Sequence, residues 1–358
     1  MKSLNSMHSR RSSDSSSETN SIASVVHEQI DAIGNNAEDL YQTWGAIIQD
    51  WPNACKKQKS FIQELVRKGI PHNLRGLIWQ HLCNVQVANS GPGMREKYSE
   101  LLSRSSPCEK IIKRDISRTF PEHEHFKEPG GAGQEGLLNV MKTYSLFDTE
   151  VGYCQGSAFI VGVLLLNMPE EDAFAVFQSL MYDYRMREMF KPTMAELGLC
   201  IYQLECLVQE LLPELYNHFQ AHNFHTSMYA SSWFLTLFTS SLPLHIANRA
   251  MDLFLSEGQE ILFRLSISIL QLCRFDLLKL DMESMLKYFQ REMPQRLELD
   301  PDYLIHLAVQ LKIDQKKMKR LAKEYTTIKA KEQEELVELR VSFFPFFLLS
   351  FLINFYLF

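Results

Sequence analysis

Two short polar segments carry residue types that could stabilise charge on a phosphate. The first, IKRDISR at residues 112–118, places Asp115 three residues before Arg118. If residues 112–120 form a helix, Ile112 and Ile116 share one face, and Asp115 shares the opposite arc with Arg114 and Arg118. The carboxylate could then brace the guanidinium near the helix end, which Pro121 should set. The spacing also fits an ordinary ion pair between Asp115 and Arg118 at the surface. On spacing alone this interpretation is favoured over a functional arginine.

The second segment, VGYCQG at residues 151–156, places Gln155 directly ahead of the apolar run 158–166. This run is too short to span a bilayer and predicts a buried helix. Gly152 and Gly156 permit a tight turn or a close backbone approach. We therefore expect Gln155 at the N-terminal end of a core helix, where its amide could position a water molecule or bond a partner's backbone. A local cap or core hydrogen bond is the plainer alternative.

Other chemical patterns are weaker. Cys154 has no basic neighbour, so it is not expected to be a nucleophile. GAGQEG at residues 131–136 fits a dinucleotide-binding pattern but follows Pro129 and Gly130 rather than a strand, and the phosphate-binding pattern of nucleotide hydrolases is absent. The histidine pairs in HEHF and HNFH lack the spacing of a metal site. We therefore expect no cofactor-binding residue and no metal ligand.

Composition limits the class of protein further. The 358 residues are 46% hydrophobic and 22% charged with a net charge of −6, which suits a large core and argues against a general nucleic-acid binder. The seven cysteines include no C-x-x-C pair and suit a reducing cytosol. The N-terminus lacks the apolar region of a secretory signal, so a cytoplasmic protein is expected.

Hydrophobic spacing of three to four residues dominates the chain, and β alternation is absent, so the predicted class is all-α with many short helices. A helix from Leu40 should break at Trp51-Pro52, and a second should run from Ser60 to Gly69. Further helices are predicted at HFQAHNF, TSMYASSWFLTLF, PLHIANRAMDLFLSEG and EILFRLSISILQLC, with the aromatic side chains of the second segment in the core.

The predicted organisation has five parts. Residues 1–38 form a Ser-rich disordered tail, in which Ser12 and Ser13 could be phosphorylated or merely solvated. Helices at 39–68 lead into a domain at 69–295. The charged segment 296–340 reads as the truncated start of a coiled coil, either packed on the domain or forming a dimer seam. The uncharged residues 341–358 suggest a membrane anchor or an aberrant end from translation past an exon.

Three motifs in order resemble the TBC domain of Rab GTPase-activating proteins over roughly residues 69–295. GIPHNLRGLIWQ at 69–80 resembles the family's opening motif, IKRDISR matches I-x-x-D-x-x-R, and YCQ matches Y-x-Q. Each motif alone is weak, but three in order are highly specific. EVGYCQGSAFIVG, PTMAELGLCIYQLE and HTSMYASSWFLTLF are most similar to the ecotropic viral integration site 5-like branch, whose coiled coil this chain leaves after Arg340.

The resemblance implies a two-lobed helical fold that accelerates GTP hydrolysis by a GTP-bound Rab GTPase and so regulates membrane trafficking. It implies that Arg118 is an arginine finger and Gln155 a glutamine finger. The same resemblance gives supporting or structural roles to a further set: Asp115, Tyr153, Ile112, Gly156, Arg75 and Trp79. GTP and Mg²⁺ would belong to the GTPase, and this cytoplasmic chain would be recruited to endomembranes. The alternatives are a non-catalytic Rab-binding module and a membrane-trafficking scaffold.

Overall fold

The computed structural model describes residues 37–85 and 93–334, and every regular element in them is a helix. The all-α prediction is therefore confirmed. The predictions for the serine-rich tail and for the apolar residues 341–358 lie outside the described residues. The helices, in chain order, are α2 (Ala37–Gln49), α3 (Trp51–Lys57), α4 (Lys59–Lys68), η1 (His72–Leu74), α5 (Arg75–Leu82), α7 (Met94–Leu102), α8 (Glu109–Ile116), α9 (Ala132–Phe147), α10 (Ser157–Leu165), α11 (Glu170–Tyr182), α12 (Arg187–Phe190), α13 (Ala195–Leu211), α14 (Pro213–Ala221), α15 (Ser227–Thr236), α16 (Leu244–Glu257), α17 (Glu260–Leu277), α18 (Met282–Lys287), the π-helical η2 (Tyr288–Glu292), α19 (Met293–Glu298), α20 (Pro301–Gln310) and a helix over residues 315–334.

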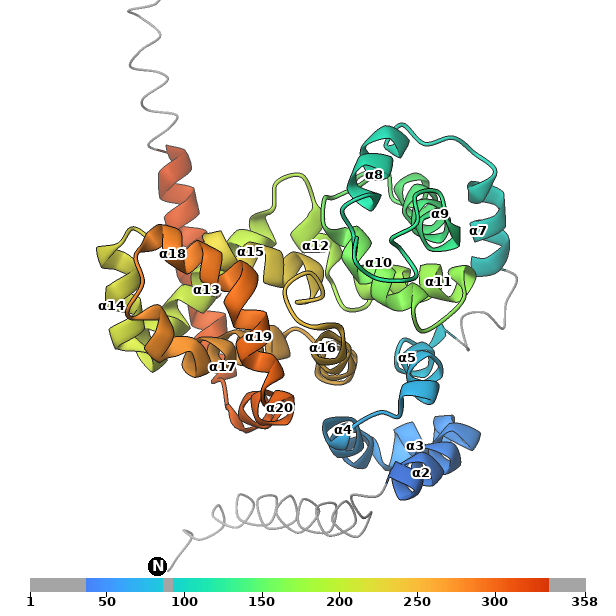
Figure 1. The fold of residues 1–358 in the computed structure, drawn as a ribbon, viewed down its shortest axis with the longest axis horizontal. Coiled ribbons are helices and arrows are strands. Elements are labelled where there is room, and N and C mark those ends of the chain that lie inside the picture. Colours follow the sequence, from blue (N-terminus) through green and yellow to red (C-terminus); the bar gives the residue numbers. More distant parts are fainter. Residues whose placement is uncertain (1–36, 86–92, 335–358) are drawn as a thin grey trace, which may run out of the picture.

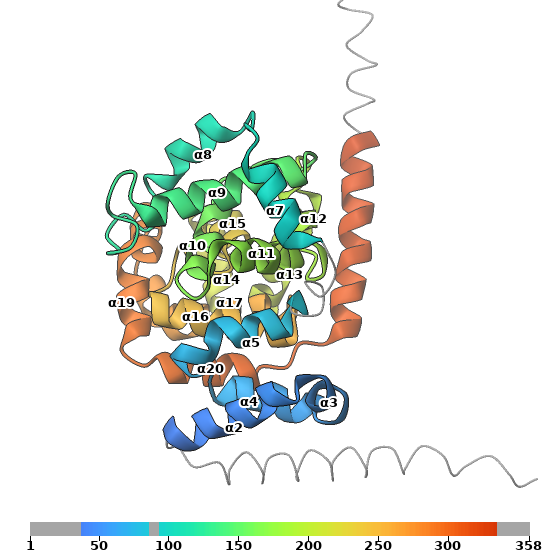
Figure 2. The same ribbon diagram turned by 90° about the vertical axis from the view of Figure 1, so that its right-hand side faces the viewer.

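The helices group into two lobes, as predicted. Helices α7 to α11 form one lobe, and α13, α14 and α17 to α20 form the other, with α16 between them and α5 beneath α11 (Figure 1). Helix α10 is almost entirely apolar and buried, because it packs against α9 and α11 and also reaches α15. In the orthogonal view the helix over residues 315–334 runs along the side of the domain (Figure 2). Because α10 packs against α9, α11 and α15, its first turn is held by the core of the domain.

The structure confirms two of the predicted N-terminal helices, α2 and α4, but Trp51 and Pro52 begin a further helix, α3, where the sequence predicted only a break. Helix α2 ends at Gln49, and Pro52 occupies the first turn of α3, where its missing N–H costs nothing. Helix α4 ends in basic residues followed by Gly69, whose φ of +146° lies in a region that glycine favours. The indole of the fully buried Trp44 donates to the Gly69 carbonyl at 2.9 Å. These helices are thus packed on the domain rather than attached to it loosely.

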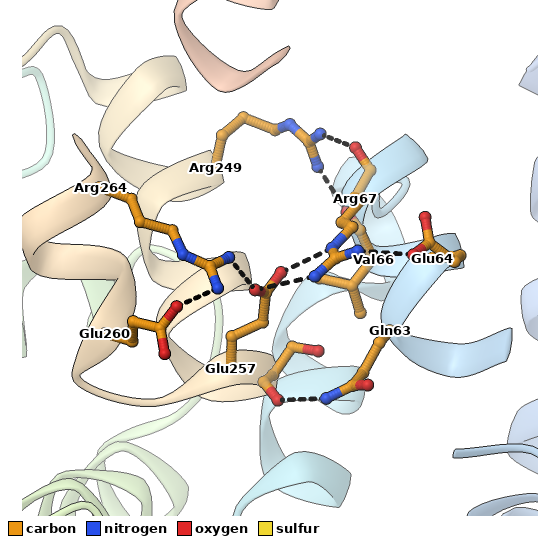
Figure 3. A network of polar contacts seen from close by, with 9 residues as sticks. Gln63, Glu64, Val66, Arg67, Arg249, Glu257, Glu260 and Arg264 are labelled. Atoms are coloured by element: carbon orange, nitrogen blue, oxygen red, sulfur yellow. Dashed lines mark hydrogen bonds and ion pairs between the residues drawn. The ribbon is translucent and has the colours of Figure 1, made fainter. Parts of the chain in front are cut away.

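A network of ion pairs fastens α4 to α16 and α17 (Figure 3). Arg67 donates to both Glu257 oxygens at 2.8 and 3.0 Å, and Arg264 donates to Glu257 at 2.9 Å. Arg249 donates to the carbonyls of Val66 and Arg67 at 3.0 and 2.6 Å. These carbonyls belong to the last turn of α4, where no intrahelical N–H can reach them. The network therefore completes the C-terminus of α4 with side chains from α16.

Arg75 and Trp79, for which the sequence suggests a structural role, meet at a buried carboxylate. Arg75 Nε lies 3.1 Å and Trp79 Nε1 lies 2.8 Å from Asp252, which is fully buried in α16. Burial raises the pKa of Asp252 above its ordinary value, while the positive charges of Arg75 and Arg249 oppose that rise. Arg75 also donates to the Ile70 carbonyl at 3.0 Å. Asp252 thus joins α5 and the preceding loop to α16.

The charged C-terminal helix packs on the domain along the part that the structure describes. Gln203 of α13 donates to the Met318 carbonyl at 3.0 Å, and Leu321 is buried. The Tyr325 ring packs against the Tyr202 ring with the centroids 5.4 Å apart, whereas Ile328 is 41% exposed. Met318 and Leu321 are therefore buried against this chain's own helices rather than presented as a dimer seam.

Across residues 37–85 and 93–334, none of the helices combines the length and the apolar character that crossing a bilayer requires.

We expect Asp252→Ala to lower the free energy of unfolding by about 3–5 kcal/mol, because it leaves Arg75 buried and unpaired. Urea denaturation followed by circular dichroism measures this. Glu100→Ala is the control, since Glu100 forms an exposed pair with Lys97 and its loss should change stability little. Equal urea midpoints for the two variants would show that Asp252 does not stabilise the fold.

Candidate functional site

Arg118 lies in a turn just after a helix rather than inside one. Helix α8 ends at Ile116, so the expectation of a helix through Phe120 is wrong. Phe120 precedes Pro121, which disfavours the helical conformation, and it adopts a positive φ of 49°. Its ring packs against Phe126 and Phe159, with centroids 5.9 and 5.1 Å away. This packing draws the chain away from the helix axis and leaves Arg118 at the surface.

Asp115 is buried, which corrects the prediction that it lies on an exposed arc opposite Ile112 and Ile116. All three side chains are buried: α8 packs against α9, and the loop that carries Tyr153 and Gly156 bonds Asp115. Residues 112, 115 and 116 stand at i, i+3 and i+4 and therefore share one face of α8, so the placement of Asp115 on the opposite arc is wrong. The hydrogen-bond partners that Asp115 finds there include a segment about forty residues further along the chain. A buried carboxylate must be paired or hydrogen-bonded, and Asp115 has such partners from both segments.

The Asp115 carboxylate joins the two predicted segments. Its Oδ1 accepts from Arg118 Nε and pairs with Arg118 Nη2. Its Oδ2 accepts from the Tyr153 hydroxyl and, at 3.3 Å, from the Gly156 N–H. The Asp115 side chain is 4% exposed, whereas the Arg118 side chain is 54% exposed. The carboxylate therefore holds an arginine on one side and the glutamine segment on the other, while the guanidinium remains open to solvent.

Gln155 stands at the N-terminal end of α10, as the sequence predicts. Gly156 caps α10 with a φ of +97°, a left-handed conformation that L side chains rarely adopt. A side chain there would also press on the Thr236 methyl group, because a Cβ would lie 3.3 Å from it. The Gln155 side chain is exposed and has no hydrogen-bond partner among residues 37–85 and 93–334. The alternative in which it caps the helix or bonds within the core is therefore not what the structure shows.

The neighbours of Gln155 are protonated at neutral pH. Burial, with a smaller contribution from the Asp115 charge, raises the pKa of the Cys154 thiol to about 11. Cys154 is therefore a poor nucleophile, which agrees with the sequence analysis. Burial and the hydrogen bond to Asp115 also raise the pKa of Tyr153, so that its hydroxyl stays a donor.

The glycine-rich stretch has a structural explanation. Gly131 precedes the first turn of α9, and Gly133 faces the His125 carbonyl so closely that a Cβ would collide with it. The stretch thus allows a loop to pack on α9. In the part of the chain that the structure describes, no three His, Cys, Asp or Glu side chains are grouped so that they could hold a metal ion.

Sequence reasoning missed a second buried carboxylate, Asp148, at the start of the loop that carries Gln155. Its partner Arg187 lies 39 residues later and donates to it from Nε at 2.6 Å and from Nη2 at 2.9 Å. No local pattern connects two residues so far apart. The sequence offered one signal for this carboxylate. Asp148 is an acidic residue directly after a long helix, a position that the helix dipole disfavours.

Comparison with known proteins places this geometry in a family. The model of the Rab-GTPase-TBC domain matches residues 72–278. The chain is 56% identical over 340 residues to the human ecotropic viral integration site 5 protein homolog, covering 95% of this chain and 41% of that protein. It is 56% identical over 303 residues to the Rab GTPase-activating protein eat-17 of Caenorhabditis elegans, covering 85% and 34%.

Among solved structures, the flagellar RabGAP TBC domain of Chlamydomonas matches with a TM-score of 0.63 and 27% identity, covering 76% of this chain and 93% of that one. The chain spans less than half the length of the two sequence relatives. The matched residues include both Asp115 with its partners and the Asp252 cluster. On this evidence the chain belongs to the Rab-GTPase-TBC domain family.

Proposed function

We propose that this chain is a GTPase-activating protein that accelerates GTP hydrolysis by a Rab-family GTPase, with Arg118 and Gln155 supplied in trans. One observation carries the proposal. A single buried carboxylate, Asp115, holds both the Arg118 side chain and the backbone beside Gln155, and both functional groups are exposed. The name of the nematode relative, a Rab GTPase-activating protein, supports the same reaction.

Arg118 would stabilise charge on the phosphates. GTP hydrolysis builds negative charge on the phosphate oxygens, and catalysis consists mainly of positioning and charge stabilisation. A guanidinium is permanently charged and carries five N–H donors in a plane, so it can bond two phosphate oxygens at once. An arginine supplied in trans is worth about 10³–10⁵ in rate, which corresponds to roughly 4–7 kcal/mol.

Gln155 would orient the attacking water. A carboxamide donates and accepts hydrogen bonds at once, so it can hold a water molecule and also bond the partner's backbone. Because the Gln155 side chain has no hydrogen-bond partner within the described chain, both functions are free to face a partner. GTP and its Mg²⁺ would be bound by the GTPase, and in this proposal the chain contributes protein side chains alone.

The proposed setting is the surface of an endomembrane, where the GTP-bound Rab would recruit the chain and membrane trafficking would respond to its loss. A second candidate, a module that binds a Rab without stimulating it, uses the same surface. The exposed Arg118 side chain on its buried brace favours the catalytic function, because binding alone needs no such presentation.

We expect Arg118→Lys to lower the single-turnover rate of GTP hydrolysis at least 100-fold, nearly as much as Arg118→Ala, because a point charge cannot bond two oxygens in a fixed plane. A panel of GTP-loaded Rab GTPases mixed with this chain provides the assay. Arg104→Lys, an exposed substitution in the turn after α7, is the matched control and should keep the parental rate. Near-parental turnover by Arg118→Lys would contradict the proposed role.

We expect Gln155→Ala to slow hydrolysis about 10²–10³-fold, as does the loss of one preorganised polar group in other active sites. Its thermal unfolding should match the parent, because the Gln155 side chain is exposed and forms no hydrogen bond with any residue in the described part of the chain. Calorimetry and the single-turnover assay test both statements. A lower melting temperature with an unchanged rate would instead assign Gln155 a role in stability.

A further inference from the structure

The loop that carries Gln155 begins at Asp148, directly after α9, and this carboxylate is surrounded by donors. Arg187 binds both of its oxygens, at 2.6 and 2.9 Å. The hydroxyls of Tyr144 and Tyr182 lie 3.1 and 3.2 Å from Oδ2, and the Val151 N–H lies 3.3 Å from Oδ1. Four of these five hydrogen bonds come from side chains of α9, α11 and α12. The loop is thus attached to two helices of its lobe and to α12.

Arg187 extends this attachment along the loop. Its Nη2 also donates to Glu150 at 2.6 Å, so that one guanidinium holds two carboxylates of the loop. The Asp148 side chain is 2% exposed and that of Arg187 is 15% exposed. Burial alone would raise the pKa of Asp148, but the hydrogen bonds from Arg187 and Val151 outweigh it, and the pKa lies below its ordinary value. Asp148 therefore remains charged and paired at neutral pH.

The loop that connects the contacts to Asp148 with the contacts to Asp115 is short and turns at Gly152. The Gly152 N–H donates to the Asp148 carbonyl at 2.7 Å, and Gly152 has a positive φ of 59°. The next residue, Tyr153, bonds Asp115, as does Gly156. Asp148 and Asp115 therefore fix the two ends of the loop. The Gln155 side chain lies between them and forms no hydrogen bond with the residues that the structure describes.

Stability of α9 does not account for a carboxylate at this position. Asp148 follows the last turn of α9, where the helix dipole disfavours negative charge. Burying this charge also carries a desolvation cost that only well-placed partners offset. An uncharged residue would end α9 at a lower cost in free energy. The charge of Asp148 is therefore better explained by its pairing with Arg187, which holds the loop.

We propose that Asp148 and Arg187 are a positioning pair, which sets where Gln155 is presented to the nucleotide by anchoring the first half of its loop. This inference rests on the proposed function, since it concerns the rate at which Gln155 acts. Neither residue touches the partner's nucleotide in this proposal. A misplacement of about 1 Å in a catalytic group can cost on the order of 100-fold in rate.

The test is a double-mutant cycle under single-turnover conditions with GTP-loaded Rab GTPases. Asp148→Asn should lower the maximal rate about 10-fold or more, with less than about a threefold change in the half-saturating concentration. In a Gln155→Ala background, Asp148→Asn should cause no further loss, because the residue acts through Gln155. Losses that multiply in the double variant would overturn the proposal.

Two further variants keep the test decisive if Asp148→Asn folds poorly. Arg187→Lys retains the charge but cannot hold Asp148 and Glu150 together, so its rate should lie between those of the parent and Arg187→Gln. Asp252→Asn is the matched control, because it removes a buried carboxylate that pairs with arginine away from the loop. It should lower the melting temperature while the rate per folded molecule stays unchanged. An equal rate loss in this control would show that general destabilisation explains the effect.

Amide hydrogen exchange of the chain alone separates this inference from the proposed function. Asp148→Asn should speed exchange at Val151 and Gly152, whose N–H groups bond Asp148. Unchanged exchange would overturn the positioning pair even if the parent stimulates a Rab. Faster exchange in a chain that stimulates none of the GTPases would support the anchored loop and reject the proposed function instead.

Discussion

The buried carboxylate of Asp115 is the contact on which the arrangement of the site depends. Burying a charge is unfavourable unless its lone pairs are filled, and here the donors come from two segments about forty residues apart in sequence. Arg118 fills one oxygen, while Tyr153 and Gly156 fill the other. If either segment moved away, the Asp115 carboxylate would lose hydrogen-bond partners. This cost keeps the two segments together.

The same chemistry recurs at Asp148 and Asp252, but with different consequences. Asp252 joins α5 to α16 through Arg75 and Trp79 and lies in the scaffold. Asp148 is the first residue of the Gln155 loop, and Asp115 of α8 accepts a hydrogen bond from Gly156 at the end of that loop. A carboxylate that accepts several directed hydrogen bonds fixes geometry better than apolar packing of the same volume, because each donor must meet a lone pair. This directional demand suits a loop that must present one amide accurately.

The sequence predicted what local patterns determine. The all-α class, the helix after Gln155 and the end of α4 at Gly69 all followed from hydrophobic period and from glycine and proline placement. The end of α8 was misplaced because Phe120 leaves the helix to pack against Phe126 and Phe159. The bond between Asp115 and Tyr153 and the pairing of Asp148 with Arg187 depend on tertiary contacts between distant segments. Such contacts leave no period in the sequence.

The contrast between the two functional side chains suggests how the site divides its work. Arg118 is held by Asp115 through Nε and Nη2, which leaves other N–H donors of its five for the phosphate contacts that we propose. Gln155 has no such brace, and ordering a glutamine side chain costs up to about 2 kcal/mol. Contacts with the partner would have to offset that entropy cost. The chain itself can reduce the total cost of ordering only by fixing the backbone from which Gln155 extends. Two carboxylates at the two ends of one short loop, with left-handed glycines between them, meet that requirement while keeping the amide itself free to bond water.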